Sequence, residues 1–261
     1  MKITVLGSGT STGVPTIGCR CGVCLSDIPK NKRLRSSCLV ECEGKSILID
    51  TSPDLRQQAL THHIPRIDAV LFTHNHADHV HGIDDLRVFN AWQNQEIPIF
   101  GDHAMMEHLI DKFGYIFKPS LGYTGFVPKL VPHVVSGRFD CVGVPVTMLP
   151  CEHGPRAQTM NYRIGNMAWL TDTSGIPEAT GELMQGLDVL FVDGLRIEPH
   201  NTHFNLEQAL KAARQIGAKQ TYLIHLAHDY DHDEFEKTLP EGVKLAFDGL
   251  TVTLPSNHHQ A

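Results

Sequence analysis

The stretch His74-Asn75-His76-Ala77-Asp78-His79 follows directly on Asp68–Thr73, a short apolar run that predicts a buried strand. The HxHxDH pattern therefore brings three imidazoles and a carboxylate to a strand end. Neutral imidazole and carboxylate are donors that Zn, Mn and Fe accept in proteins. A solvated polar turn is the alternative interpretation, but this spacing directly after a buried strand favours a metal site.

Six residues cannot close a two-metal site by themselves, so further ligands must come from the ends of later strands. Such positions, where a rigid scaffold gives way to a loop, commonly carry functional side chains. Three residues in the second half of the chain stand at them: His153 after a strand ending at Leu149, Asp172 after Met167–Leu170, and His225 after Thr221–Ile224.

Short apolar strands alternate with helices along the chain. The predicted strands are Lys2–Leu6, Cys38–Cys42, Ser46–Asp50, Asp68–Thr73, Ile97–Phe100, Val144–Leu149, Thr159–Ile164, Met167–Leu170, Val189–Val192 and Thr221–Ile224. Three helices are predicted. The first begins at Ser52 as a cap, with Pro53 in the first helical position, and the second runs from about Asp102 to Phe113. The third runs to Ile216 from an Asn205 cap, with Gln208 in a capping box. This alternation excludes an all-α fold and predicts an α/β sandwich.

One domain is predicted over residues 1–261, because neither a linker of biased composition nor a repeat interrupts the chain. Residues 114–136 are rich in Gly, Pro and aromatic side chains and predict a functional loop or lid. No apolar run approaches the roughly 20 residues that span a bilayer. The N-terminal segment also lacks the pattern of a signal peptide. We therefore expect a cytoplasmic protein with no membrane partner.

The charge balance argues against nucleic acid as a partner. The chain carries 22 Lys and Arg against 29 Asp and Glu, a formal net charge of −7. A broad nucleic-acid interface would need a basic face. An anionic small molecule is still compatible with this balance, because a bound metal ion can dominate the local field.

Three of the seven cysteines crowd into the segment 18–24. In a cytosolic chain such a cluster favours a structural zinc site over disulfides. Tetrahedral zinc needs a fourth N or S ligand. The three thiolates are Cys19, Cys21 and Cys24, and the candidates for the fourth ligand are His228, Cys38 and Cys42. Free buried cysteines, or a redox pair at Cys21 and Cys24, are the alternatives.

The order of the proposed ligands resembles that of the metallo-β-lactamase superfamily. The resemblance implies an αββα sandwich with a binuclear site at one edge of the two sheets, holding two divalent ions, Zn or Mn. Residue by residue, it implies that one ion is held by His74, His76 and His153, the other by Asp78, His79 and His225, and both by Asp172.

A narrower resemblance rests on the glycine-rich Leu6–Pro15, the CxCxxC cluster, Asp172-Thr173-Ser174-Gly175 and Phe247-Asp248-Gly249. These motifs resemble the phosphoribosyl cyclic phosphodiesterase family of the carbon–phosphorus lyase pathway. The resemblance implies His228 as the fourth zinc ligand, His203 as the general acid, and a homodimer. His200 competes with His203, since spacing alone does not separate them. The glycine-rich segment either cradles phosphate or, as we favour, lets the first strand turn sharply.

The leading hypothesis is a metal-dependent hydrolase, a phosphodiesterase acting on a small (cyclic) phosphodiester such as phosphoribosyl 1,2-cyclic phosphate. In it Asp78, besides binding metal, orients the nucleophile or accepts its proton, and His203 protonates the departing oxygen. Alternatives are a ribonuclease Z-like tRNA 3′-processing endonuclease, a lactonase or thioesterase of the same fold, and a non-catalytic accessory protein of cofactor biosynthesis. The sequence shows no basic arm for RNA, and every ligand position is filled.

Overall fold

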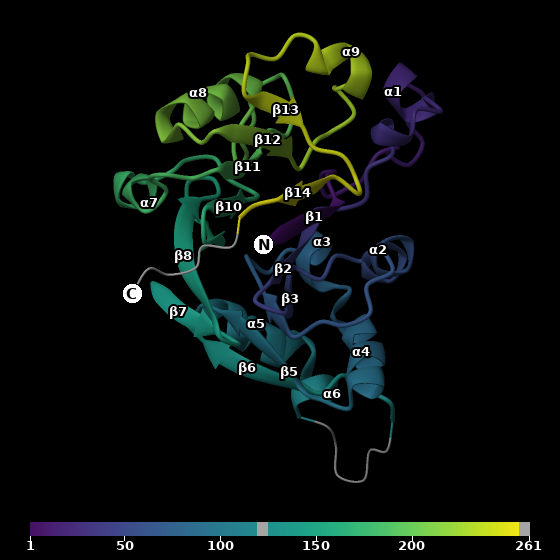
Figure 1. Ribbon diagram of the computed structural model, residues 1–261. Helices are drawn as coiled ribbons and strands as arrows, with labels where there is room; N and C mark the ends of the chain where they lie inside the picture. The colour runs from purple at the N-terminus through teal and green to yellow at the C-terminus, as the bar shows by residue number, and fades with distance from the viewer. Residues whose placement is uncertain (119–124, 256–261) are drawn as a thin grey trace.

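Two seven-stranded sheets form the centre of the molecule in the computed structural model, which describes residues 1–118 and 125–255 (Figure 1). The first sheet has the order β14 (Thr251–Thr253), β1 (Lys2–Gly7), β2 (Ser37–Cys42), β3 (Lys45–Ile49), β4 (Ala69–Leu71), β5 (Ile97–Gly101) and β6 (Leu130–Val134). The second has the order β13 (Val243–Leu245), β12 (Gln220–Ile224), β11 (Val189–Asp193), β10 (Met167–Leu170), β9 (Gln158–Ile164), β8 (Val144–Glu152) and β7 (Arg138–Cys141).

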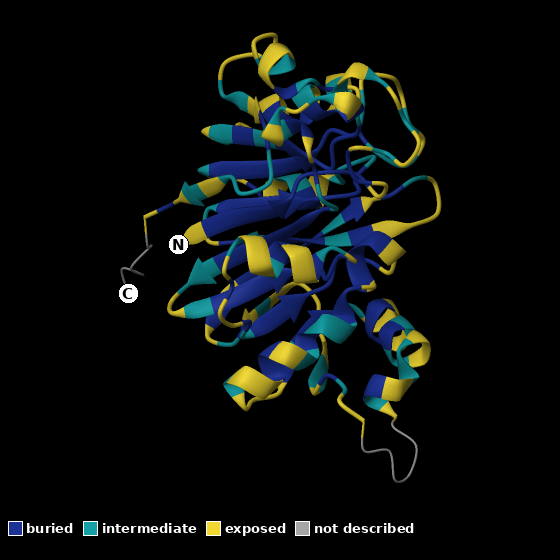
Figure 2. Ribbon diagram, turned by 90° about the vertical axis from the view of Figure 1, so that its right-hand side faces the viewer, coloured by how far each residue is buried: buried dark blue, intermediate teal, exposed yellow. Residues whose placement is uncertain are grey.

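Helices cover the outer face of each sheet. The longer ones are α2 (Leu55–Thr61), α4 (Leu86–Gln93) and α5 (His103–Lys112) on the first sheet, and α8 (Leu206–Ile216) on the second. The short ones are α1 (Gly22–Leu25), α3 (Ala77–Val80), α6 (Gly114–Phe117), α7 (Glu178–Glu182) and α9 (His232–Glu236), with 3-10 turns at Pro29–Asn31 and Ile83–Asp85. In Figure 2 the central strands are almost wholly buried, whereas the edge strands and the helices carry exposed residues.

The alternation of side chains along each strand explains this layering. In β3, Ile47 and Ile49 join the core between the two sheets, whereas Leu48 points outward into the core under the helices. In the second sheet Trp169 faces the inner core and Leu170 packs under α8. Because both faces of each sheet are covered, the strands are continuous apolar runs. The expected αββα sandwich is confirmed.

The predicted strands are all present, with ends that differ by at most three residues. The capping box at α8 is also present: Asn205 accepts from the Gln208 amide at 3.0 Å, and Gln208 Oε1 accepts from the Asn205 amide at 3.0 Å. The predicted cap at Ser52 is wrong. Helix α2 begins at Leu55 with Asp54 at its N-cap, because Ser52 and Pro53 lie in the preceding turn.

Part of the predicted lid over residues 114–136 is regular structure. It contains α6 and the strand β6, which pairs in parallel with β5 from Leu130 opposite Ile97 to Val134 opposite Gly101. The prediction of a loop is therefore wrong for these residues. Pro132 lies in this strand because β6 is at the sheet edge, where a missing N–H can be tolerated. Residues 119–124 lie outside the described residues, and the lid itself stays a prediction.

Within residues 1–118 and 125–255, no helix has both the length and the apolar character that crossing a membrane requires.

Candidate metal centre

The HxHxDH segment forms the turn between β4 and α3. His74 and His79 are buried, Asp78 is 8% exposed, and His76 faces solvent. Asp50, at the end of β3, holds the start of this turn, because its carboxylate accepts from the Thr73 amide at 2.8 Å and the Thr73 hydroxyl at 2.7 Å. The neighbouring parallel strand thus fixes where the histidines begin.

Two groups of donor atoms converge at this edge of the sandwich. In each group the imidazole nitrogens and carboxylate oxygens all lie within 4.8 Å of one another. The first group is His74, His76, His153 and Asp172; the second is Asp78, His79, Asp172 and His225. The structure therefore brings together all seven residues that the sequence selected, in the two sets expected.

Asp172 lies between the two groups with one oxygen toward each. Its Oδ2 is 3.7 Å from His74 Nε2, and its Oδ1 is 3.1 Å from His79 Nε2 and 3.4 Å from His225 Nε2. Asp172 and His225 both have left-handed backbone conformations, with φ of 50° and 58°. Such conformations are costly for residues with a Cβ and persist where the surroundings enforce them. The geometry is that of a carboxylate that can bridge two ions.

The second nitrogen of several imidazoles is already engaged. His79 Nδ1 lies 2.7 Å from Asp50 Oδ2, and His153 Nδ1 lies 2.8 Å from the carbonyl oxygen of Thr202. A carbonyl can only accept, so His153 Nδ1 carries the proton and its Nε2 is left as an acceptor for a cation. This outer hydrogen bonding is the usual means of orienting histidine ligands.

The buried donor atoms fit a divalent cation. His74 Nε2, Asp78 Oδ2, His79 Nε2 and His225 Nε2 have no hydrogen-bond partner among the described residues. Buried polar atoms are rarely left unpaired without a reason, and a bound ion is one such reason. Burial alone would raise the pKa of Asp172, but His225, His79 and His74 hold it well below its usual range. The carboxylate is therefore ionised and suited to a cation.

His203 lies beside Asp172 but belongs to neither group. Its Nδ1 is 2.7 Å from Asp193 Oδ2, and its Nε2 is 3.8 Å from Asp172 Oδ2. Asp193 is fixed in turn by the amides of Thr173 at 2.9 Å and Leu195 at 3.1 Å. The His200 ring centroid lies 5.1 Å from that of His203, its Nδ1 accepts from the Thr202 amide, and it belongs to no donor group of the described residues. Of the two competing histidines, the geometry favours His203.

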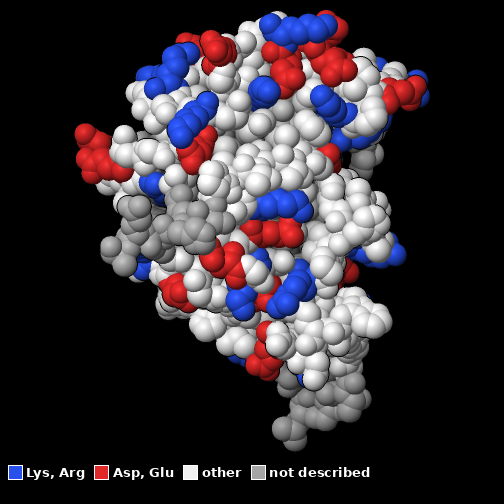
Figure 3. All heavy atoms as spheres, in the orientation of Figure 1, with Lys and Arg blue, Asp and Glu red and all other residues white. Residues whose placement is uncertain are grey.

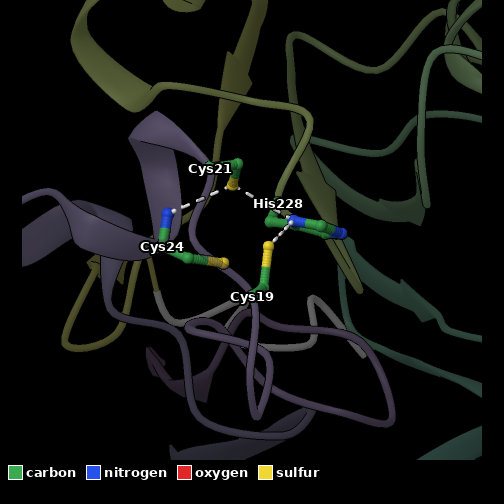
Figure 4. A group of neighbouring side chains, drawn as sticks. All are labelled: Cys19, Cys21, Cys24 and His228. Atoms are coloured by element: carbon green, nitrogen blue, oxygen red, sulfur yellow. Dashed lines mark hydrogen bonds between the residues drawn. The ribbon is translucent and has the colours of Figure 1, made fainter.

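A separate cluster of sulfur and nitrogen donors joins the segment 19–24 to His228, three residues after His225 (Figure 4). Cys19 Sγ and Cys21 Sγ each lie 3.3 Å from His228 Nδ1, and Cys24 completes the group. The Cys24 amide and His228 together lower the pKa of Cys21 to about 6, whereas burial raises that of Cys24 to about 11. The other candidates for the fourth ligand, Cys38 and Cys42, lie in β2 and outside this group.

A family profile described as "Beta-lactamase superfamily domain" matches residues 45–226, which include all seven residues of the two His/Asp groups. The chain belongs to the metallo-β-lactamase superfamily. It has the fold and the donor clusters of a metal-dependent hydrolase, and the metallo-β-lactamase fold implies divalent metal ions.

Similar proteins carry different names. The chain is 40% identical over 254 residues to an octanoyltransferase of Porphyromonas gingivalis; the match covers 96% of this chain but 51% of that protein, so the chain spans about half its length. A crystal structure titled as a new diphosphatase from the PhnP family is 42% identical, with a TM-score of 0.89 and 96% of each chain covered. Zn²⁺-bound PqqB from Methylobacterium extorquens has the same fold at 22% identity, with a TM-score of 0.77 and 97% of this chain and 100% of that chain covered.

Sequence reasoning missed two carboxylates that support this metallo-β-lactamase centre, Asp50 behind His79 and Asp193 behind His203. The signal was present, because both lie at the C-terminal ends of predicted strands, as Asp172 does. Asp50 is also in a left-handed conformation, with φ of 61°, where the chain turns away from β3.

Proposed function

We propose that this chain is a binuclear metal-dependent phosphodiesterase that hydrolyses a small, cyclic phosphodiester of the phosphoribosyl 1,2-cyclic phosphate type. Two ions, Zn or Mn, are held by the two donor groups defined above, with Asp172 shared between them. Mixed imidazole and carboxylate ligands suit both metals. The narrower sequence resemblance and the PhnP-family diphosphatase of similar structure support a phosphorus-centred reaction.

One observation carries the proposal: the free nitrogen of His203 faces the shared carboxylate. Its Nε2 lies 3.8 Å from Asp172 Oδ2, and the Asp193 carboxylate holds the opposite nitrogen at 2.7 Å. An acid beside a two-ion site is what a diester with an alkoxide leaving group requires. A thioester reaction has less need of it, because a thiolate leaves without a proton.

The residues around the centre have distinct roles in this proposal. When bound, two divalent ions lower the pKa of water and polarise phosphoryl oxygens. Asp78, whose pKa is held below its usual range by His225 and His79 despite burial, remains ionised and can orient the attacking water or take its proton. His203 delivers a proton to the departing oxygen from Nε2, while Asp193 keeps the ring in place.

A small molecule rather than RNA is the proposed substrate. Lys, Arg, Asp and Glu are interspersed on the face shown in Figure 3, where no extended region carries positive charge alone. With a formal net charge of −7, the chain lacks the basic surplus that supports RNA binding. The homodimer, the cytoplasmic location and the absence of membrane partners stay predictions.

A diphosphate ester is a second candidate substrate. The observation in its favour is the name of the PhnP-family structure, a diphosphatase 42% identical to this chain. A phosphate leaves more readily than an alkoxide, so such a reaction depends less on His203. The name of the P. gingivalis relative similarly justifies testing an octanoyl thioester.

A substrate panel tests the proposed function. With the metals loaded, we expect a cyclic ribose phosphodiester to be hydrolysed at least about 100-fold faster in kcat/KM than a phosphomonoester or a lactone, since a well-placed general acid contributes about that much or more. The panel also contains bis(p-nitrophenyl) phosphate, a dinucleotide diphosphate, an octanoyl thioester and a precursor tRNA. Preference for the dinucleotide would select the diphosphatase, and preference for the precursor tRNA would reject the small-molecule substrate. Preference for the thioester or the lactone would reject phosphodiesterase activity.

We further propose that the Cys19, Cys21, Cys24 and His228 cluster holds one structural zinc ion. Its four donors are those of a closed tetrahedral site, which contributes folding free energy when filled. Cys21→Ser is expected to lose one equivalent of zinc per chain and to lower the melting temperature. Zinc content and thermal unfolding measure both effects, and Cys42→Ser, in β2, is the matched control. An unchanged melting temperature together with full zinc content would contradict the proposed structural zinc site.

A further inference from the structure

One short turn carries a donor of each metal cluster. His225-Leu226-Ala227-His228 follows β12, and two residues separate the active-site donor His225 from the zinc donor His228. These four residues lie beyond the end of β12 and form no helix, so regular secondary structure does not fix the turn. Contacts from elsewhere in the chain must therefore determine where both imidazoles lie.

Arg33 supplies contacts to this turn from the interior. Its side chain is among the largest fully buried ones, with 1% of the residue exposed. The guanidinium donates from Nη1 to the Ala227 carbonyl at 3.1 Å and from Nη2 to the Tyr230 carbonyl at 2.7 Å. Burial lowers the pKa of Arg33 to about 10, so the side chain remains charged at neutral pH.

Arg33 is itself fixed by the segment around the zinc cluster. Its backbone pairs with Val14 in both directions, with N–O distances of 2.7 and 2.8 Å. A Cβ on Gly9 would lie 2.9 Å from both the Arg33 carbonyl oxygen and the Arg33 Cβ, so only glycine allows this approach. The guanidinium therefore has little freedom to follow a displaced turn.

The glycine-rich segment holds the other side of the turn. Ser8 accepts from the Leu226 amide at 2.9 Å, and the Thr10 amide donates to the Leu226 carbonyl at 3.1 Å. The Gly9 amide donates to the Leu34 carbonyl at 2.8 Å. These amides are occupied by the protein itself, which favours the interpretation of the segment as a sharp turn rather than a phosphate cradle.

We propose that Arg33 is a positioning residue that sets His225 and His228 together, so that the binuclear centre and the Cys/His zinc site respond jointly to its loss. The proposal rests on the two metal sites of the proposed function but not on its substrate. Without the guanidinium, the Ala227 carbonyl in the turn and the Tyr230 carbonyl two residues after it lose this donor. An unpaired buried carbonyl is costly, so the turn rearranges and carries both imidazoles away from their clusters.

Arg33→Met tests the proposal in the full chain loaded with Co²⁺. Thiolate-to-cobalt charge-transfer absorption reports the Cys/His site, and ligand-field bands of nitrogen and oxygen coordination report the binuclear centre. A competing chelator is titrated and both signals are followed. Since loss of an outer partner of a ligand typically costs 10–100-fold in metal affinity, we expect both signals to fall at about 10–100-fold lower chelator concentration.

Arg163→Met is the matched control. Arg163 also donates its guanidinium to backbone carbonyls, those of Gly165, Leu183 and Gln185, but none of these belongs to a metal cluster. In Arg163→Met, both cobalt signals should fall at the same chelator concentration as in the unmodified chain. Arg33→Lys retains the charge and can donate to one carbonyl. Its cobalt signals should be lost at chelator concentrations between those of the unmodified chain and those of Arg33→Met.

The outcomes separate the proposals. The role of Arg33 is overturned if Arg33→Met and Arg163→Met lose cobalt at the same chelator concentration. It is also overturned if Arg33→Met weakens metal binding at one site alone. Absence of nitrogen and oxygen ligand-field bands from the unmodified chain overturns the proposed binuclear centre itself. If Arg33→Met does not fold, Arg33→Lys against Arg163→Lys decides by the same comparison, with joint weakening supporting the proposal and equal responses rejecting it.

Discussion

Asp172→Ala is expected to remove both active-site ions and to abolish hydrolysis at the same time. Asp172 is the residue common to the two donor groups, and its oxygens face His74 on one side and His79 and His225 on the other. Loss of an outer partner of a ligand costs about 10–100-fold in metal affinity, so loss of a ligand shared by two ions should cost more at each. Metal analysis after gel filtration, together with turnover of a phosphodiester, measures the result.

The structural zinc should survive this substitution, because the Cys/His cluster does not include Asp172. The variant is therefore expected to keep one equivalent of zinc and to lose two further equivalents. Asp111→Ala is the control, since Asp111 is an exposed carboxylate next to Lys112 in α5. If Asp172→Ala retained two equivalents beyond the structural zinc and turned over normally, the binuclear assignment would be wrong.

The sequence identified the ligand set because of how parallel strands are arranged. β4 lies in one parallel run, and β10 and β12 lie in another, so the carboxyl ends within each run meet at the same edge. Residues placed just after these strands therefore converge in space even when they are about 100 residues apart. The four donors of the HxHxDH turn after β4, Asp172 after β10 and His225 after β12 are instances of this rule.

Supporting carboxylates were harder to predict than ligands. Asp50 and Asp193 each end a strand, but a lone Asp at a strand end has no second donor beside it to mark it. Their roles depend on which imidazole lies opposite, and that is set by the packing of distant segments: Asp50 lies 29 positions from His79, and Asp193 lies 10 from His203. Local sequence patterns do not carry that information.

The missed strands have similar causes. β13 and β14 contain three residues each and β7 contains four, too few for an alternating pattern to be distinguished from a loop. β6 contains Pro132 and is partly exposed, so its composition resembles that of a loop, and only its place at the edge of the sheet makes it a strand. The sequence therefore predicted the central strands better than the edges.

His203→Ala is expected to keep both active-site ions and the fold but to lower kcat for a ribose-type diester by about 10²–10⁴-fold, the usual contribution of a general acid. The histidine is outside both proposed ligand groups, yet its Nε2 lies 3.8 Å from Asp172 Oδ2. An alkoxide leaves poorly unless it is protonated, so the ribose-type diester should show the full loss. Metal analysis is needed alongside kinetics, because the His203 ring stacks on His225 with centroids 4.8 Å apart.

The identity of the leaving group separates acid catalysis from other roles of His203. A p-nitrophenolate is stable without a proton, so the same variant should lose much less activity on bis(p-nitrophenyl) phosphate than on the ribose-type diester. Equal large losses on both substrates would instead indicate that His203 binds phosphate or supports the metals, and near-normal rates on both would leave it with a structural role at most.

His200→Ala is the matched control. His200 belongs to no donor group, and its Nδ1 accepts from the Thr202 amide, so its removal should leave the ratio of the two rates unchanged. A leaving-group-dependent loss in His200→Ala and not in His203→Ala would transfer the role of acid to His200.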